Sequence, residues 1–499
     1  MSRFFCLILL VSAAVQAVPL KVRVSCDGRL PYDPDTKGFA QISFQNAVLG
    51  RLLRLNDQHQ MVPVLLEQAY WDYGAKAYVL RLPARLTFSN GSAVAEDLDF
   101  SLTRFFLTTG RADPIAFLRG IVGVEALKKG AAYTPWQVAG ITKVDERTVS
   151  VRLKDRDPSF MFGLTLGWVS LVPKEALAED YVTWKNHPVG AGPYVVVSGC
   201  GKSCLRLKAH AGSGFSGPET VEFVSDPQVQ VDVVGFTPSP TGQYEKIFGE
   251  GPVGFTGIFF NYESPLAKDP NFRKALALSI DRAGLVNGEF GITPLYEILT
   301  SNFIGRVKLT ELQQVEETKR LLAQVPKELL AQPLRAFGFS ARAEVTGFEA
   351  AVLDRLRTQW KAAGLRVEFA RSTDPLFAVN DRDTVFRVDE RGTGFADPLP
   401  VFYAFYSGYL ARLFPKSEFQ FGKLLAAASA ASGLGEKAQR VQAISRYFLE
   451  NRYAVPLYEK RLAFWVRPGR ITSLGKQQGV GLDVTTVRVA AAGKSERSE

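Results

Sequence analysis

The stretch from Met61 to Phe106 reads MVPVLLEQAYWDYGAKAYVLRLPARLTFSNGSAVAEDLDFSLTRFF and carries the clearest structural pattern of the chain. Side chains alternate in polarity from Tyr78 to Leu82, which predicts a half-buried strand. Asn90-Gly91 is a tight-turn signal because both residues tolerate positive φ. Acidic residues and apolar positions at helical spacing then predict a helix that begins at Ala95. The stretch has no catalytic pattern, and we interpret it as a structural signature.

The length and charge of the chain limit the classes of protein to which it can belong. A chain of 499 residues is too long for one core, so we expect two or three lobes. The formal net charge is +10, but lysines and arginines are scattered and form no basic runs with interleaved aromatics. This distribution favours a solvated basic surface over a nucleic-acid interface, and it leaves an acidic ligand or an anionic membrane surface open.

The first 17 residues have the pattern of an export signal. Arg3 precedes an apolar run from Phe4 to Ala14, and Val15-Gln16-Ala17 is a small-residue cleavage site. The run is shorter than the roughly 20 residues that span a bilayer. We therefore expect a signal peptide cleaved after Ala17 and an exported protein. Residues 491–499 are expected to form a polar tail.

Three cysteines remain after the expected cleavage. Cys200 and Cys204 flank the expected tip of a hairpin, and an exported protein can oxidise them, so we favour a disulfide. A metal site that includes His210 is the alternative. Cys26 is expected to be buried and free.

Helical and strand patterns alternate along the chain, without an internal repeat or a low-complexity linker. The expected helices cover residues 45–55, 113–130, 269–283, 311–324, 348–363 and 436–451. The expected strands cover residues 22–24, 141–144, 149–153, 195–197, 205–207, 221–224, 231–234, 258–261, 365–369, 385–388 and 455–458. This order predicts an α/β fold whose lobes are joined by strand crossings.

Signatures of catalysis are scarce. The sequence contains no GxSxG, HExxH or P-loop, and no GxGxxG that opens a helix after a strand. His59, His187 and His210 are isolated, and acidic pairs such as Glu96-Asp97 are expected on solvated helix faces. These observations favour a binding protein without cofactor or metal. A secreted enzyme such as a hydrolase is the alternative from another class.

Aromatic residues crowd one region after Gly394. We expect most of them in a packed core and some along a cleft, where rings bury apolar surface and offer polar tips. The residues are Phe395, Phe402, Tyr403, Phe405, Tyr406 and Tyr409.

Five segments in order resemble motifs of one family. They are 91–101 (GSAVAEDLDFS), 140–149 (GITKVDERTV), 188–194 (PVGAGPY), 261–282 and 454–458 (AVPLY). From about Tyr32 to Pro468 the chain resembles the bacterial extracellular solute-binding proteins of family 5, the peptide/nickel-type substrate-binding components of ABC importers. It departs from them after Gly91, where the link to the helix is one residue short and lacks a capping Thr.

The resemblance implies a two-lobed α/β periplasmic binding protein fold of type II, with an additional subdomain and a ligand cleft between the lobes. Lobe I would comprise residues 18–44, 155–258 and 455–490, the additional subdomain residues 45–154, and lobe II residues 259–454. The lobes would close on the ligand by a hinge motion. The crossings are expected near residues 259–261 and 455–464.

The resemblance further implies a periplasmic monomer. The protein would capture a peptide or peptide-like ligand and deliver it to an ABC transporter permease complex in the inner membrane. From the family position and the aromatic cluster we expect six ligand-binding residues. These are Tyr32 and Phe39 in lobe I, and Arg391, Thr393, Phe395 and Asp397 in lobe II.

One departure concerns the ligand. Peptide-binding members anchor the amino terminus of the ligand with an Asp three residues before an acidic-Pro pair. Asp397-Pro398 resembles that pair, so the anchoring position falls on Gly394. A buried ammonium without a partner is costly, so peptide binding would require Asp397 or Asp389 to take the role. The alternatives are a non-peptide ligand (a metal chelate, a sugar or an acidic compound) and a sensor or surface protein independent of transport.

Overall fold

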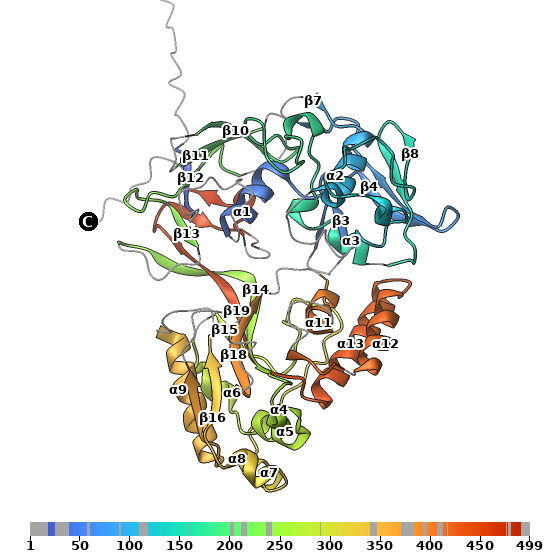
Figure 1. The fold of residues 1–499 in the computed structure, drawn as a ribbon. Helices are drawn as coiled ribbons and strands as arrows, with labels where there is room; N and C mark the ends of the chain where they lie inside the picture. Colours follow the sequence, from blue (N-terminus) through green and yellow to red (C-terminus); the bar gives the residue numbers. More distant parts are fainter. Residues whose placement is uncertain are drawn as a thin grey trace, which may run out of the picture.

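Two bodies joined by a pair of long strands make up the protein (Figure 1). The computed structural model describes residues 18–24, 39–56, 60–88, 91–108, 118–157, 159–199, 204–210, 217–235, 242–289, 291–339, 347–370, 384–392, 397–406, 413–416, 418–475, 477 and 481–490. None of the helices in these ranges is both long and apolar enough to cross a membrane.

The joining strands are β14 (Glu245–Phe260) and β19 (Ala454–Val466). They pair antiparallel from Glu245 opposite Val466 to Phe259 opposite Ala454, with irregularities in register around Pro252. Among the described strands they lie in the middle of an 11-stranded sheet with the order β10-β11-β12-β1-β13-β19-β14-β18-β16-β17, while β15 (Ile292–Pro294) pairs with β19 off this path. One continuous sheet therefore links the two bodies.

Lobe I is built on the first half of this sheet. Its strands are β10 (Tyr194–Gly199), β11 (Cys204–Ala209), β12 (Thr220–Val224), β1 (Leu20–Arg23) and β13 (Val233–Gly235). Strand β1 is parallel to both β12 and β13, so the amino-terminal strand is central. Val22 and Phe464 are fully buried in the core of this lobe. A small pair, β20 (Ile471–Ser473) and β21 (Arg488–Val489), lies close by.

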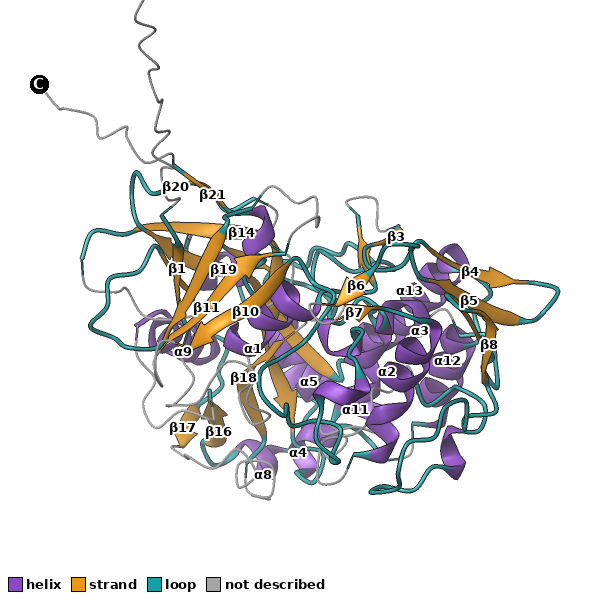
Figure 2. Cartoon of the chain, turned by 90° about the horizontal axis from the view of Figure 1, so that it is seen from above, coloured by secondary structure: helices purple, strands orange, loops and turns teal. Residues whose placement is uncertain are grey.

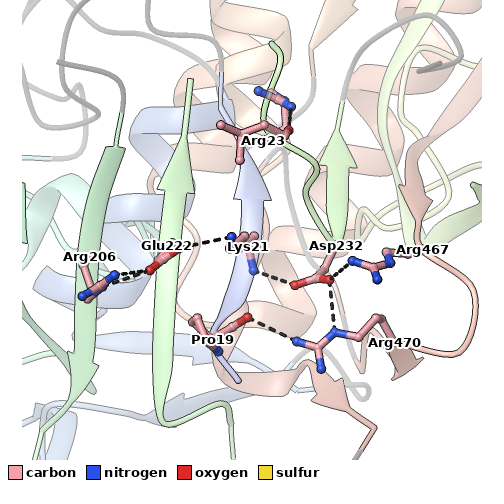
Figure 3. Close-up of polar contacts among 9 residues, drawn as sticks. Pro19, Lys21, Arg23, Arg206, Glu222, Asp232, Arg467 and Arg470 are labelled. Carbon is pink, nitrogen blue, oxygen red and sulfur yellow. Dashed lines mark hydrogen bonds and ion pairs between the residues drawn. The ribbon is translucent and has the colours of Figure 1, made fainter. Parts of the chain in front are cut away.

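Buried carboxylates hold the start of β1 in place (Figure 3). Asp232 is 3% exposed and accepts a hydrogen bond from the backbone N–H of Lys21 at 2.9 Å. Its carboxylate also lies 3.2 Å from Arg470 Nε and 3.8 Å from Arg467. On the other side of β1, Glu222 pairs with Arg206 at 2.7 Å. These contacts satisfy charges that would be costly to bury alone, and they fix the strand that follows the expected cleavage site.

Lobe II contains the other half of the sheet. Strands β18 (Phe386–Gly392), β16 (Leu334–Gly338) and β17 (Val367–Ala370) extend it beyond β14, and β16 is parallel to both its neighbours. The helices are α4 (Pro265–Lys268), α5 (Pro270–Leu278), α6 (Arg282–Val286), α7 (Val315–Leu322), α8 (Lys327–Leu330), α9 (Gly347–Ala362), α11 (Leu399–Tyr406), α12 (Phe419–Ser429) and α13 (Leu434–Glu450). Their shared core includes Ile258, Trp360 and Phe448.

The additional subdomain contains the segment from Met61 to Phe106. Strands β4 (Gln68–Asp72), β5 (Ala77–Arg81), β9 (Thr148–Val151) and β8 (Ile141–Asp145) form an antiparallel sheet. Helix α2 (Ala95–Leu107) accompanies it, with the small pairs β2-β3 (Leu53–Leu55, Met61–Pro63) and β6-β7 (Thr87–Phe88, Gly91–Ser92). The short α3 (Ser159–Gly163) lies beyond residue 154, the expected end of the subdomain, yet Phe160 is buried in the same core, so we describe α3 with the subdomain. Seen from above, this subdomain lies beside the lobe I strands (Figure 2). The strand, hairpin and helix expected from the sequence are present, but the strand is buried on both faces rather than half-buried, since Tyr78, Val79 and Leu80 are all buried.

Helix α2 lacks the capping Thr that the family motif has before this helix. Its N-terminus is capped by Asp97, whose Oδ2 accepts a hydrogen bond from the backbone N–H of Val94 at 2.9 Å. Burial raises the pKa of Asp97 to about 6, although the Val94 hydrogen bond acts in the opposite direction. The same carboxyl therefore caps the helix and binds a proton more tightly in the folded protein than an exposed aspartate does.

Asp97 makes stability depend on pH, and this is testable by comparison with Asp97→Asn. Because the folded-state pKa lies above the ordinary 3.8, the folded protein binds the proton more tightly, and this stabilisation is lost as pH rises from about 4 through about 6. Asn keeps an oxygen for the cap but does not titrate. The free energy of unfolding of the variant, relative to that of wild type, should therefore rise by on the order of 1 kcal/mol between pH 4 and pH 7, a value discounted for partial exposure. Urea unfolding at several pH values measures this difference. A difference that does not change with pH would contradict the prediction.

The expected helix over residues 45–55 is wrong. Helix α1 (Phe39–Phe44) continues as a π-helix, η1 (Gln45–Leu49), in which the N–H of Gly50 donates to the Gln45 carbonyl five residues back. The helix ends there because Gly50 adopts a φ of 75°, and β2 follows. The apolar spacing of this stretch suits a helix, but its second half pairs as a strand with β3 instead.

The expected helix over residues 113–130 is only partly testable. Residues 109–117 lie outside the described ranges, and residues 118–130 contain turns and a single 3₁₀ turn, η2 (Val124–Ala126). The start of the helix expected over 269–283 is confirmed, since Asp269 accepts hydrogen bonds from the N–H groups of Asn271 and Phe272 at 2.8 and 3.0 Å. Its expected end is wrong, because α5 stops at Leu278 and α6 begins at Arg282. The helices expected near 311–324, 348–363 and 436–451 are present as α7, α9 and α13.

Candidate functional site

Charged side chains lie along β18 of lobe II, toward its carboxyl end. Arg387, Asp389 and Arg391 occupy every second position of this strand, and they therefore share one face of it. Arg391 Nη2 lies 3.2 Å and Arg387 Nε 3.8 Å from Asp389 Oδ2. The guanidinium of Arg391 also lies 4.9 Å from the ring centroid of Phe259 on β14, a cation–π distance. Asp389 is thus neutralised by two arginines.

Asp397 stands at the start of α11 and is fully buried. Its Oδ1 accepts a hydrogen bond from the backbone N–H of Leu399 at 3.0 Å, which caps the helix. Its Oδ2 accepts from Lys437 Nζ at 2.7 Å, and both side chains are 0% exposed. Lys437 belongs to the first turn of α13, so this ion pair joins α11 to α13.

Phe39 is placed in lobe I. It opens α1, and its ring packs against the end of β13 so closely that a Cβ on Gly235 would lie 2.7 Å from it. The ring centroid of Phe464 on β19 lies 6.2 Å away. Phe39 therefore belongs to the lobe opposite Arg391 and Asp397, as the resemblance implies, and its role in ligand binding stays a prediction.

Several predicted site residues cannot be placed. Tyr32, Thr393 and Phe395 lie outside the described residues, as does Gly394. Cys26 and Cys200 do too, while Cys204 begins β11, so the Cys200–Cys204 disulfide stays a prediction. Across the described ranges, no three His, Cys, Asp or Glu side chains are grouped as a metal site.

The aromatic cluster divides into two groups. Phe402 and Phe405 on α11 are buried and pack on the lobe II core, and Phe405 stacks on Phe259 with ring centroids 5.8 Å apart. Tyr403 and Tyr406, on the same helix, remain 36% and 39% exposed. The expected core packing is thus confirmed for Phe402 and Phe405. Phe395 and Tyr409 lie outside the described residues, and the cleft-lining role stays a prediction.

Two residues of the site were not anticipated. Lys437 had the pattern of a solvated helix residue, and Phe162 that of an ordinary apolar one, yet Lys437 Nζ lies 5.0 Å from the ring centroid of Phe162 on α3. No local pattern identifies such a contact, because it joins residues 275 positions apart (437 minus 162). From the sequence, Asp397 is a possible replacement for the carboxylate missing at Gly394, but no sequence pattern predicts a cationic partner for it.

The arrangement has a clear chemical consequence. Both carboxylates that could replace an acid at position 394, Asp389 and Asp397, already have cationic partners within the protein. A ligand ammonium placed here would have to compete with a lysine or two arginines. The described part of the site therefore does not favour a buried positive charge on the ligand.

Comparison with known proteins agrees with this architecture. The sequence profile of the bacterial extracellular solute-binding proteins, family 5, middle region, matches residues 60–212 and 228–411. A Brucella ovis protein named as an ABC transporter peptide-binding protein is 26% identical over 180 residues, which cover 31% of this chain and 33% of the relative. The match to the curated relatives thus spans about a third of their length.

Solved structures share the fold across nearly the whole chain. The substrate-binding protein CtaP of Listeria monocytogenes aligns with a TM-score of 0.76 at 17% identity, covering 95% of this chain and 100% of its own. NikA of Brucella suis, solved with Fe(III)-EDTA, aligns with a TM-score of 0.75 at 14% identity, covering 94% and 99%. Both similarities support the two-lobed fold. Because the family profile matches well over half of the sequence, the chain belongs to the family 5 bacterial extracellular solute-binding proteins.

Proposed function

We propose that this protein is an exported, monomeric ligand carrier of an ABC importer. Its signal peptide is cleaved after Ala17, it closes its two lobes around a ligand in the periplasm, and it delivers that ligand to a permease complex in the inner membrane. Membership of family 5, whose members are solute-binding transport proteins, supports this role. So does the similarity to a relative named as an ABC transporter peptide-binding protein.

The ligand is proposed to be a peptide or peptide-like molecule that is recognised without a buried ammonium. The observation that carries this proposal is the Asp397–Lys437 pair, fully buried with a 2.7 Å contact. Asp389 is likewise paired with Arg391. Backbone and aromatic contacts near Arg391, Thr393, Phe395 and Asp397, with Tyr32 and Phe39 opposite, would then hold an extended ligand whose amino end is blocked or points out of this site.

Matched peptides test this proposal. Tri-alanine and N-acetyl-tri-alanine differ by one charge at the amino end. Because Asp389 and Asp397 both have cationic partners, acetylation should cost no more than about threefold in Kd, which is less than 1 kcal/mol. Isothermal titration calorimetry, after a thermal-shift screen with longer peptide pairs of the same design, measures the ratio. Free-amino peptides that bind more than about 30-fold tighter than their acetylated partners would contradict the proposal.

A second candidate is a metal chelate or another acidic compound. It is favoured by the two arginines that share Asp389, which leave more cationic than anionic groups on this face of β18. NikA, which shares the fold, was solved with Fe(III)-EDTA. A rise in melting temperature with anionic chelates, and none with either member of the peptide pairs at millimolar concentration, would favour this candidate over peptides.

A further inference from the structure

Lys437 lies where lobe II meets the amino-terminal body of the protein. Its Nζ is 2.7 Å from Asp397 Oδ2 and 5.0 Å from the ring centroid of Phe162. Lys437 and Asp397 are 0% exposed, and Phe162 is 2% exposed. The ammonium is therefore enclosed between a carboxylate on one side and an aromatic face on another.

These partners belong to different cores. Phe160 and Leu164, the neighbours of Phe162 in and beside α3, are buried in the core of the additional subdomain. Val441 and Phe448, on the same helix as Lys437, are buried in the core of lobe II. Figure 1 shows α3 at the edge of its body that faces α11 and α13. The contact between Lys437 and Phe162 thus crosses between the two bodies.

Burial of this ion pair depends on the bodies being together. Asp397 and Lys437 move as one unit because both belong to lobe II, whereas Phe162 moves with the other body. Separation of the bodies would remove the ring and expose the ammonium to water. A cation–π contact is strongest when it is desolvated, so the closed arrangement gains an interaction that the open one lacks.

We propose that Lys437 and Phe162 form a closure contact that favours the closed lobes in the absence of ligand. The ammonium is held in place by Asp397, and the ring of Phe162 binds it across the interface. This inference goes beyond ligand capture, because the contact uses only residues of the protein. It also makes Lys437 a positioning residue that sets the open-to-closed ratio before any ligand arrives.

Small-angle X-ray scattering of the ligand-free protein tests the proposal. Ligand is removed by unfolding, dialysis and refolding, and wild type is compared with Phe162→Leu and Phe162→Tyr. Leu keeps an apolar cover but has no aromatic face, so the open-to-closed ratio should rise by about 30-fold and the radius of gyration should increase. Tyr should behave as wild type. Equal radii of gyration for wild type and Phe162→Leu would overturn the proposal, because the ring would then contribute nothing to closure.

A second arm tests the charge itself. Lys437→Ala removes three methylenes and the ammonium, which together correspond to propylammonium. Millimolar propylammonium should restore the compact radius of gyration of this variant, and 1-propanol at the same concentration should not. Rescue by both compounds, or by neither, would overturn the role of the charge. Since no ligand is present in either arm, the outcome is independent of the proposed function.

Discussion

Asp397→Ala is expected to lower the free energy of unfolding of lobe II by about 3–5 kcal/mol. The variant leaves the ammonium of Lys437 buried without its 2.7 Å partner, and it removes the oxygen that caps α11 at Leu399. Loss of one member of a buried ion pair is far more costly than loss of both, because the remaining charge has no compensation. Urea unfolding followed by circular dichroism and by tryptophan fluorescence measures the change and shows whether the lobes unfold separately.

A double variant separates the ion pair from the cap. Asp397→Ala combined with Lys437→Met removes both charges, so it should recover most of the stability lost in the single variant. Asp397→Asn keeps an acceptor for the Leu399 N–H and should fall between wild type and Asp397→Ala. If the free energy of unfolding of Asp397→Ala lay within about 1 kcal/mol of that of wild type, Lys437 would have to reach water, contrary to its burial in the structure.

Gly190→Ala is expected to lower the free energy of unfolding by a similar amount, about 3 kcal/mol or more, because the added methyl group would clash with the backbone. Gly190 belongs to the PVGAGPY segment, which packs on the backbone of η1. A Cβ at this position would lie 2.8 Å from the Leu49 Cα and closer still to the Val48 carbonyl oxygen. Backbone atoms cannot rotate away as a side chain can, and the Gly192 N–H, which donates to the same carbonyl at 2.9 Å, would be displaced.

Gly435→Ala is the matched control for this variant. Gly435 lies in the first turn of α13, where a Cβ would meet nothing within 4 Å. The same chemical change should there be neutral or slightly stabilising, because Ala favours a helix over Gly. Melting temperatures and urea midpoints of the two variants give the comparison. If Gly190→Ala lost no more stability than Gly435→Ala, the close approach of the backbone at Gly190 would be contradicted.

Local patterns predicted the elements whose stability is local. The strand Ala77–Arg81, helix Ala95–Leu107 and the cap at Asp269 each follow from alternation, spacing or a side-chain oxygen at the right position. The family resemblance added the two-lobed fold, which no single motif could show. The positions of Phe39 in one lobe and of Arg391 in the other follow from that resemblance.

Elements that depend on distant partners were missed. Strand β14 begins at Glu245, 13 residues before the expected start at 258, because its glycines and Pro252 have the composition of a loop. It is a strand because β19 pairs with it over its length. The π-helix Gln45–Leu49 is similar, since the glycines that accommodate it lie about 140 residues later, at 190 and 192. The Lys437 contacts arise only when α11, α13 and α3 are packed together.

The central claim is that this protein carries a small ligand between its lobes. Native mass spectrometry of the protein purified from the cells that naturally produce it tests it most directly. We predict a polypeptide that begins at Val18 with one small molecule bound per chain, which is released on unfolding and fragments as an amide-linked compound. A polypeptide that retains residues 1–17, or one that carries no small molecule under conditions that preserve non-covalent complexes, would contradict the account.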